Sequence, residues 1–145
     1  LEELYGKDSV VLIHDGIRPM ISQEIINDCI STTREYGNAI TVIPCAEAMV
    51  VTNDQKTSNK VYPRDELKRT QTPQGFFLGD ICDLHREAIQ RGILNSVASV
   101  TLMIELGKKV NFCRGSEKNV KLTTVEDIDI FKALLQSKCS SWLKE

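Results

Sequence analysis

SVVLIH, residues 9–14, is a short and uninterrupted apolar run that leads directly into Asp15-Gly16. A continuous apolar run of this length is typical of a strand buried on both faces, as in a parallel sheet. Ser22 is a suitable N-cap for a helix whose apolar residues lie between positions 25 and 30, and AITVI at residues 39–43 predicts a second buried strand. A strand, a helix and a strand in this order imply a right-handed crossover within an α/β sheet.

The next segment, residues 49–62, has a different pattern. MVVT and KVY are short β-prone runs on either side of a polar tract at residues 53–59. This arrangement predicts an exposed hairpin or arm, which we place at about residues 47–66. Because an isolated hairpin is only marginally stable in water, we expect the arm to be stabilised by packing against another surface, such as that of a second subunit.

RTQTPQGFFLGD, residues 69–80, contains turn formers around Pro73 and Gly75 and is interpreted as a turn segment. The remaining elements are a helix capped by Asp80 and ended by Gly92, a helix over residues 97–106, strands at 110–113 and 120–122, and a final helix that opens with a capping box, Thr123-x-x-Glu126.

Composition excludes several classes of protein. The chain carries 18 basic and 20 acidic residues with no basic block, so the electrostatic footprint of a nucleic-acid binder is missing. No apolar run approaches the ~20 residues that a membrane span needs, and the first residues do not resemble a signal peptide. The five cysteines contain no C-x-x-C pair, which favours reduced, buried thiols in a cytoplasmic protein over disulfides or a metal site; they are Cys29, Cys45, Cys82, Cys113 and Cys139.

Asp15 is the first candidate for chemistry, because it stands where a buried strand stops. In open α/β sheets ligands bind beyond the carboxyl ends of strands, and a carboxylate there can hold a divalent cation or a ribose hydroxyl. Arg18, three residues on, can face a phosphate or the carboxylate itself. The alternative is that Asp15 only caps a turn before Pro19.

Three further residues could contact a ligand, two of them through a phosphate and Thr72 through its hydroxyl. Arg64 follows Pro63 at the base of the predicted arm, Thr72 lies in a rigid turn before Pro73, and Lys121 lies just before the capping box. Each has an ordinary explanation as well: a surface arginine, a turn without a ligand and a solvated lysine. His14 and His85 are interpreted as structural residues, since no His, Cys and Asp set has the spacing of zinc ligands.

Four segments in order resemble one family. VLIHDGIRP (residues 11–19) resembles a V-H-D-x-x-R-P element, RTQTPQGF (69–76) resembles Q-T-P-Q-x-F, and GSEKNVKLTTVEDI (115–128) resembles G-x-x-x-N-I-K-x-T-x-x-E-D. Between the first two, residues 39–67 lie where this family has a strand and a projecting arm. The family comprises the cytidylyltransferases that act on 2-C-methyl-D-erythritol 4-phosphate and their relatives that act on ribitol phosphate.

The resemblance implies a fold: a Rossmann-like α/β nucleotidyltransferase sheet with flanking helices and a projecting β-arm, here one partial domain over residues 1–145 that is truncated at the N-terminus. It also implies roles. Asp15 would hold Mg²⁺ or the nucleotide ribose, Arg18 would support that region, and Lys121 would face the reacting phosphates. Arg64 and Thr72 would contact the acceptor's phosphate, and the arms of a homodimer would carry Arg64 to the neighbouring subunit's site.

The implied reaction is attack of the acceptor's phosphate oxygen on the α-phosphorus of CTP, with Mg²⁺ as cofactor and pyrophosphate as leaving group. The expected acceptor is 2-C-methyl-D-erythritol 4-phosphate, for isoprenoid precursor synthesis. One alternative is ribitol phosphate or another alditol phosphate, for cell-wall or capsule polymers. A different alternative is a non-catalytic homologue that serves in binding or assembly.

Three departures from the family pattern qualify these roles. The family's N-terminal Gly-rich loop, which grips CTP, is not in this chain, so we expect the chain alone to be inactive. Removal of the first strands of a parallel sheet uncovers apolar surface, so we also expect either stabilisation by dimerisation or an origin by proteolysis of a folded parent. Val97 and Ala98 stand where the family has a threonine and an acid, and Glu47-Ala48 stands where it has Asp-Thr. Because sites built for a hydroxyl discriminate strongly, these changes argue for a different acceptor.

Overall fold

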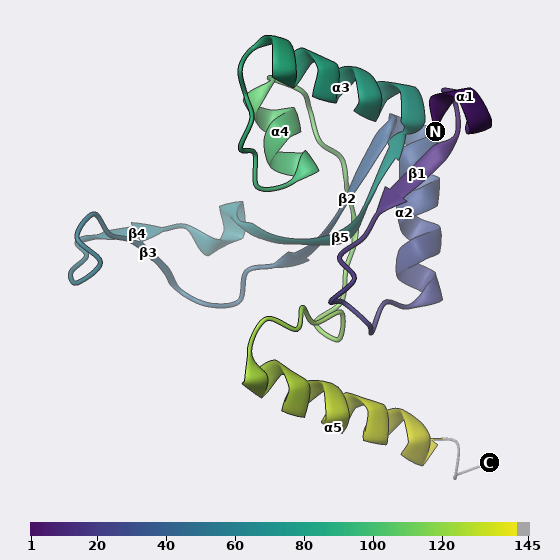
Figure 1. Ribbon diagram of the computed structural model, residues 1–145. Coiled ribbons are helices and arrows are strands. Elements are labelled where there is room, and N and C mark those ends of the chain that lie inside the picture. Colours follow the sequence, from purple (N-terminus) through teal and green to yellow (C-terminus); the bar gives the residue numbers. More distant parts are fainter. Residues whose placement is uncertain (142–145) are drawn as a thin grey trace.

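The computed structural model describes the backbone of residues 1–141 and the side chains of residues 1–137. Its centre is a four-stranded sheet in the order β1-β5-β2-β6 (Figure 1). These strands are β1 (Val10–Ile13), β2 (Asn38–Pro44), β5 (Lys68–Phe77) and β6 (Phe112–Arg114). β1 and β2 both pair antiparallel with β5, and β2 pairs parallel with β6, so β5 alone runs against the other three strands.

Helices cover both faces of this sheet, and the alternation of side chains along the strands divides the core in two. On one face, Ile40 and Phe76 pack against α3 (Leu78–Gln90) and α4 (Ser99–Glu105). On the other face, Ala39 and Cys113 pack with Cys29 of α2 (Gln23–Tyr36). Figure 1 shows α3 and α4 on the side of the sheet away from α2. The α/β architecture predicted from the sequence is therefore confirmed.

The predicted strand–helix–strand unit is present, and the right-handedness of its crossover stays a prediction. β1 and β2 run the same way and are joined by α2, yet β5 lies between them. The expectation that β1 would be buried on both faces is wrong for this structure, since β1 lies at the sheet edge and Ile13 is 41% exposed. The continuous apolar run therefore predicts a strand correctly, but it does not show whether that strand lies inside the sheet or at its edge.

The interpretation of residues 69–80 as a turn segment is wrong, because most of it forms β5, the longest strand. Pro73 is accommodated at an irregularity: Ile40 pairs with Gln74, but Val42 pairs with Thr70, so the ladder is interrupted opposite Thr41. Proline cannot donate to a ladder and is therefore confined to such positions within a sheet. The hydroxyl of Thr41 instead donates to the Pro73 carbonyl at 2.6 Å.

The predicted arm is present as an antiparallel hairpin that forms its own two-stranded sheet, β3 (Met49–Val51) and β4 (Lys60–Tyr62). It projects from the body of the molecule, and every residue of both strands is exposed (Figure 1). A 3₁₀ turn, η1 (Arg64–Glu66), follows β4 and leads into β5.

The other elements are α1 (Glu2–Tyr5) and α5 (Val125–Ser141). Asp80 is not the N-cap of α3, because that helix begins at Leu78 and Asp80 lies in its first turn. The strand expected at residues 120–122 is absent, and this segment is a loop. The capping box at the start of α5 is shifted by one residue: Thr124 Oγ1 accepts from the Asp127 N–H at 3.3 Å, and Asp127 Oδ2 accepts from the Thr124 N–H at 2.8 Å.

The cysteines fit the expectation of buried thiols as far as they are described. Cys29, Cys45 and Cys113 are buried, Cys82 is half-buried, all four are free, and the side chain of Cys139 lies outside the described residues. The hydrogen bond with Cys113, together with burial, raises the pKa of the Cys29 thiol, which keeps it protonated. Across the described helices, none combines the length and apolarity needed to cross a membrane.

Candidate active site

Asp15 lies two residues after the end of β1 and connects three parts of the chain. Its backbone N–H donates to Thr72 Oγ1 of β5 at 3.0 Å. Its carboxylate Oδ2 lies 3.2 Å from Arg18 Nε and 3.3 Å from Lys121 Nζ. The contact between the Asp15 carboxylate and Arg18 arises from a tight turn, in which the Arg18 N–H donates to the Asp15 carbonyl oxygen at 3.0 Å. The carboxylate therefore sits between two cations rather than simply capping a turn.

The loop that carries Lys121 is held against this turn by backbone and side-chain contacts. Arg18 Nη1 donates to the Asn119 carbonyl at 2.7 Å, and the Leu122 N–H donates to the Ile17 carbonyl at 2.9 Å. The Arg18 side chain is only 10% exposed, whereas that of Lys121 is 44% exposed. Arg18 thus acts as a buried support, and Lys121 leaves its ammonium accessible to a ligand.

Thr72 joins the same cluster from the irregular part of β5. Its hydroxyl lies 3.0 Å from His14 Nδ1, in addition to its contact with the backbone of Asp15. The other ring nitrogen of His14 lies 3.1 Å from the Arg18 carbonyl oxygen. Sequence reasoning assigned His14 to a structural role, but the structure places its side chain within the cluster. Its position directly before Asp15 at a strand end was the signal available in the sequence.

Beneath the cluster, a buried polar pair that sequence reasoning missed fixes the loop to β5. Asn119 has no exposed surface, and its Nδ2 donates to the Thr72 carbonyl at 2.9 Å. Gln71 exchanges two hydrogen bonds with the backbone of Ser116, at 2.9 and 3.2 Å. Gly115 allows this close approach, because a Cβ there would lie 2.5 Å from Gln71 Oε1 and 2.9 Å from the Val42 carbonyl. The network holds the backbone on both sides of the site.

Arg64 is not brought to this cluster within one chain. It lies in η1, at the base of the arm, where its side chain is 61% exposed. Its Nη1 donates to the Ala46 carbonyl at 3.2 Å, and its Nε lies 4.0 Å from Asp65. Four of the five predicted site residues therefore meet, and Arg64 is separate.

An open cavity of about 270 Å³ lies next to the cluster. Three cationic side chains line it, from Arg18, Arg69 and Lys121, and its acidic residues are Glu117 and Asp127. Arg69 forms a close ion pair with Glu117 and Lys121 pairs with Asp15, but both cationic side chains remain more than two-fifths exposed. A cationic cavity at the carboxyl end of a strand is suited to phosphate groups.

Asp15 supplies the one carboxylate of the four-residue cluster. Among residues 1–137, no group of three His, Cys, Asp or Glu side chains could hold a metal ion unaided. Mg²⁺, however, commonly binds through one or two carboxylates together with substrate phosphates and water. Asp15 Oδ2 is engaged with the two cations, and no partner of Oδ1 is found among residues 1–137, so the Asp15 carboxylate fits a cation whose other ligands are phosphate oxygens and water.

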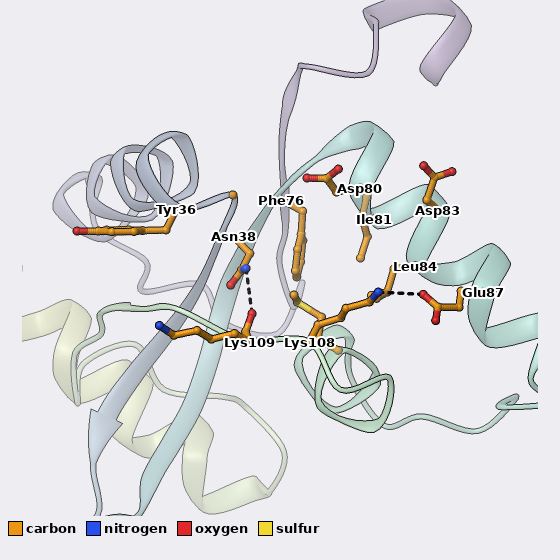
Figure 2. Close-up of a pocket in the computed structure, with 12 residues that line it drawn as sticks. Tyr36, Asn38, Phe76, Asp80, Ile81, Asp83, Leu84, Glu87, Lys108 and Lys109 are labelled. Atoms are coloured by element: carbon orange, nitrogen blue, oxygen red, sulfur yellow. Dashed lines mark hydrogen bonds and ion pairs between the residues drawn. The ribbon is translucent and has the colours of Figure 1, made fainter.

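A second cavity, of about 400 Å³, lies at the opposite end of the sheet, where β2 begins and β5 ends (Figure 2). Figure 2 shows Phe76, Ile81 and Leu84 around it together with charged residues. Lys108 pairs with Glu87 at 3.2 Å, and Asn38 donates to the Lys109 carbonyl at 3.2 Å. None of the predicted site residues lines this cavity.

Comparison with known proteins decides which family these features represent. Residues 1–137 match the sequence family described as IspD, 2-C-methyl-D-erythritol 4-phosphate cytidylyltransferase. The chain belongs to the IspD family. The expected family and fold are thereby confirmed.

The curated proteins that resemble this chain are named for two different substrates. A ribitol-5-phosphate cytidylyltransferase of Lacticaseibacillus paracasei is 40% identical over 134 residues, which are 91% of this chain and 57% of that protein. A 2-C-methyl-D-erythritol 4-phosphate cytidylyltransferase of Bacillus licheniformis is 33% identical over 133 residues, 92% of this chain and 57% of that protein. The chain therefore spans little more than half the length of the curated relatives that it matches.

The IspD fold is also evident in solved structures. The 2-C-methyl-D-erythritol 4-phosphate cytidylyltransferase of Thermus thermophilus aligns with a TM-score of 0.79 and 28% identity, covering 88% of this chain and 62% of that one. The 4-diphosphocytidyl-2C-methyl-D-erythritol synthase of Anaerococcus prevotii aligns with a TM-score of 0.77, also at 28% identity, covering 88% of this chain and 58% of that one.

Proposed function

We propose that the protein to which this chain belongs transfers CMP from CTP to a polyol phosphate and releases pyrophosphate. Membership of the IspD family supports this reaction. The observation that carries it is the meeting of Asp15, Arg18, Thr72 and Lys121 at the carboxyl end of β1. Such a cluster offers one carboxylate, an accessible ammonium and a cationic cavity, which are the groups that a reaction between two phosphates requires.

In this reaction, an oxygen of the acceptor's phosphate attacks the α-phosphorus of CTP. A new P–O bond forms, the bond to the β-phosphate bridging oxygen breaks, and pyrophosphate leaves with that bond's electron pair. Protein groups contribute by position and charge rather than by covalent chemistry. Lys121 is the group that we assign to the reacting phosphates, and Arg18 holds both Asp15 and the loop of Lys121 in place.

Asp15 is the residue that we assign to Mg²⁺, through the carboxylate oxygen that Arg18 and Lys121 leave available. When bound, Mg²⁺ would neutralise charge on the phosphates as the leaving group develops. Thr72 would contact the acceptor next to this carboxylate.

Ribitol 5-phosphate is the acceptor that we place first, and 2-C-methyl-D-erythritol 4-phosphate second. The relatives named for ribitol 5-phosphate reach 40% identity, against 33% and 34% for those named for the methylerythritol compound. Val97 and Ala98, which replace a hydroxyl and an acid of the family pattern, favour the same choice. Val97 is 93% exposed, so it is free to meet a ligand or a second subunit.

A homodimer through the arm is part of this proposal. Five apolar residues of the hairpin are between 38% and 69% exposed, which is unusual for a short hairpin that must remain folded: Met49, Val50, Val51, Val61 and Tyr62. A partner would cover them, and it would give Arg64 a phosphate to bind in the neighbouring site. A cytoplasmic location is consistent with four free cysteines.

The arm can be tested by Val61→Lys, with Asn53→Lys in the polar hairpin tip as the matched control. Sedimentation equilibrium should show that the first substitution raises the dimer Kd by about tenfold or more and that the second leaves it unchanged. A wild-type protein that is monomeric at micromolar concentration would remove the dimer from the proposal.

Activity is tested with the whole protein, CTP and Mg²⁺, by following pyrophosphate release with each of the two acceptors. Lys121→Met should lower kcat/KM by about 100-fold or more, because a charge that stabilises the transition state is lost. Lys118→Met is the matched control: this exposed lysine lies in the same loop and should leave kcat/KM unchanged. The absence of turnover with any polyol phosphate would favour the non-catalytic alternative instead.

A further inference from the structure

The imidazole of His14 lies between two site residues and contacts both of them. Nδ1 is 3.0 Å from Thr72 Oγ1, and Nε2 is 3.1 Å from the Arg18 carbonyl oxygen. Thr72 Oγ1 also accepts a hydrogen bond from the Asp15 N–H at 3.0 Å. The side chain of Thr72 is therefore held at two points, one of which is a side chain that no step of the proposed reaction uses.

The direction of these hydrogen bonds follows from the chemistry of the groups. A carbonyl oxygen can only accept, so the contact with Arg18 requires a proton on Nε2. A neutral imidazole carries a single N–H, which leaves Nδ1 as an acceptor. The hydroxyl of Thr72 must then donate its proton to Nδ1 while it accepts from the Asp15 N–H. Of the two tautomers of the neutral ring, the geometry thus assigns Nε2–H to His14.

We propose that His14 is a positioning residue that fixes the side-chain rotamer of Thr72 towards the acceptor, and this inference rests on the proposed function. The backbone of Thr72 is held independently, because its carbonyl accepts from Asn119 Nδ2 at 2.9 Å. Loss of His14 removes one of the two contacts of the Thr72 hydroxyl and the contact with the Arg18 carbonyl oxygen, while the Arg18 side chain keeps its bonds to Asp15 and Asn119. The effect should fall on acceptor binding and should leave the fold and the CTP-dependent chemistry in place.

The first experiment needs no activity. Long-range ¹H–¹⁵N correlation spectra of the whole protein at about pH 8, where imidazole side chains are ordinarily neutral, distinguish the two tautomers of each histidine. The His14→Gln variant identifies the signals of His14. The Nε2–H tautomer is expected for His14, and a predominant Nδ1–H tautomer would overturn the assignment, whether or not the protein is an enzyme.

The second experiment measures acceptor binding by kinetics. His14→Leu should raise the acceptor KM by about five- to tenfold, the loss expected for one hydrogen bond, with kcat and the KM for CTP changed less than twofold. His14→Gln should stay within about twofold of the wild type, because its amide oxygen can accept from Thr72 and its NH₂ can donate to Arg18. His85→Leu, on the exposed surface of α3, is the matched control and should change nothing.

A double-mutant cycle with Thr72→Val shows whether His14 acts through Thr72. If it does, His14→Leu should add less than twofold to the effect of Thr72→Val, because the hydroxyl that it positions is already gone. Additive effects, or a fall in kcat alone, would overturn the inference. A wild-type protein without transferase activity would instead refute the proposed function and leave the tautomer measurement to decide the assignment.

Discussion

Gly75 lies near the end of β5, where that strand packs against α2, and it has no room for a side chain. A Cβ at this position would lie 2.1 Å from Thr33 Oγ1, 3.1 Å from Cys29 Sγ and 3.2 Å from Leu12 Cδ2. Ordinary contacts of a Cβ begin at about 3.4 Å. We therefore predict that Gly75→Ala destabilises the protein by forcing α2 and β5 apart.

The size of the effect follows from what Thr33 must give up. Its side chain is fully buried, and its hydroxyl donates to the Cys29 carbonyl at 2.7 Å. Overpacking a core costs about 1–3 kcal/mol, and the lost hydrogen bond adds about 1 kcal/mol if the hydroxyl rotates away. Gly75→Ala should therefore lower the free energy of unfolding by about 2–4 kcal/mol.

Urea unfolding of the whole protein measures this loss, with Gly16→Ala as the control because a Cβ there would meet nothing within 4 Å. The decisive variant is the double substitution with Thr33→Ala, which removes the closest contact. Its total cost should be smaller than the sum of the single costs by about 1 kcal/mol or more. Additive costs, or a Gly75→Ala protein as stable as the control, would refute the steric reasoning.

Three other outcomes follow from the site. Asn119→Leu should lower the free energy of unfolding, measured by urea unfolding, by about 2 kcal/mol, because it leaves the Thr72 carbonyl without its buried hydrogen-bond donor. Asp15→Asn should raise the Mg²⁺ concentration needed for half-maximal activity, measured by pyrophosphate release, whereas an unchanged Mg²⁺ dependence would remove Asp15 from the metal site. The backbone N–H groups of Thr123 and Thr124, with the Thr123 hydroxyl, lower the pKa of Asp127 below its ordinary 3.8. A carboxyl whose pKa is lower in the folded than in the unfolded state stabilises the fold at pH values above its unfolded-state pKa. When unfolding is measured at several pH values, the wild type should therefore be more stable than Asp127→Asn near neutral pH, and this difference should fade as the pH falls below about 4.

Local patterns were sufficient wherever one segment determines its own structure. Ser22 was expected to cap α2, and its Oγ accepts from the Ile25 N–H at 3.4 Å. The hairpin of β3 and β4 was expected from two β-prone runs around a polar tract. Asp15 was expected at the end of β1 from the switch between apolar and turn residues. In each case the residues that form the feature belong to the segment that carries the sequence signal.

The strand β5 could not be predicted in the same way, since its stability depends on distant partners. Pro73 and Gly75 favour turns when only the neighbouring residues are considered. In the sheet, Pro73 lies where the ladder between β2 and β5 is interrupted opposite Thr41, and Gly75 leaves space for the side chain of Thr33 from α2. Gln71 and Asn119 were missed for a related reason. Their importance comes from burial against each other, 48 residues apart, and no spacing rule marks that contact.

α5 was predicted from its capping box, and no surface was predicted for it to pack on. The predicted helix is present, but Val125, Ile128 and Leu135 are 75%, 42% and 44% exposed. Figure 1 shows α5 lying apart from the sheet. An apolar stripe indicates that a helix is suited to packing, but it does not identify the surface on which it packs.

The site depends on β5 more than on any other element, because the carbonyl groups of Thr72 and Pro73 are fixed from three directions. Asn119 donates to the Thr72 carbonyl, Thr41 donates to the Pro73 carbonyl, and the Cys29 thiol lies 3.8 Å from that same oxygen. The backbone beneath the candidate acceptor site therefore has little freedom, and the hydroxyl of Thr72 is the part that can still turn. Two contacts orient it, one with the Asp15 N–H and one with His14 Nδ1, and both come from the chain that follows β1.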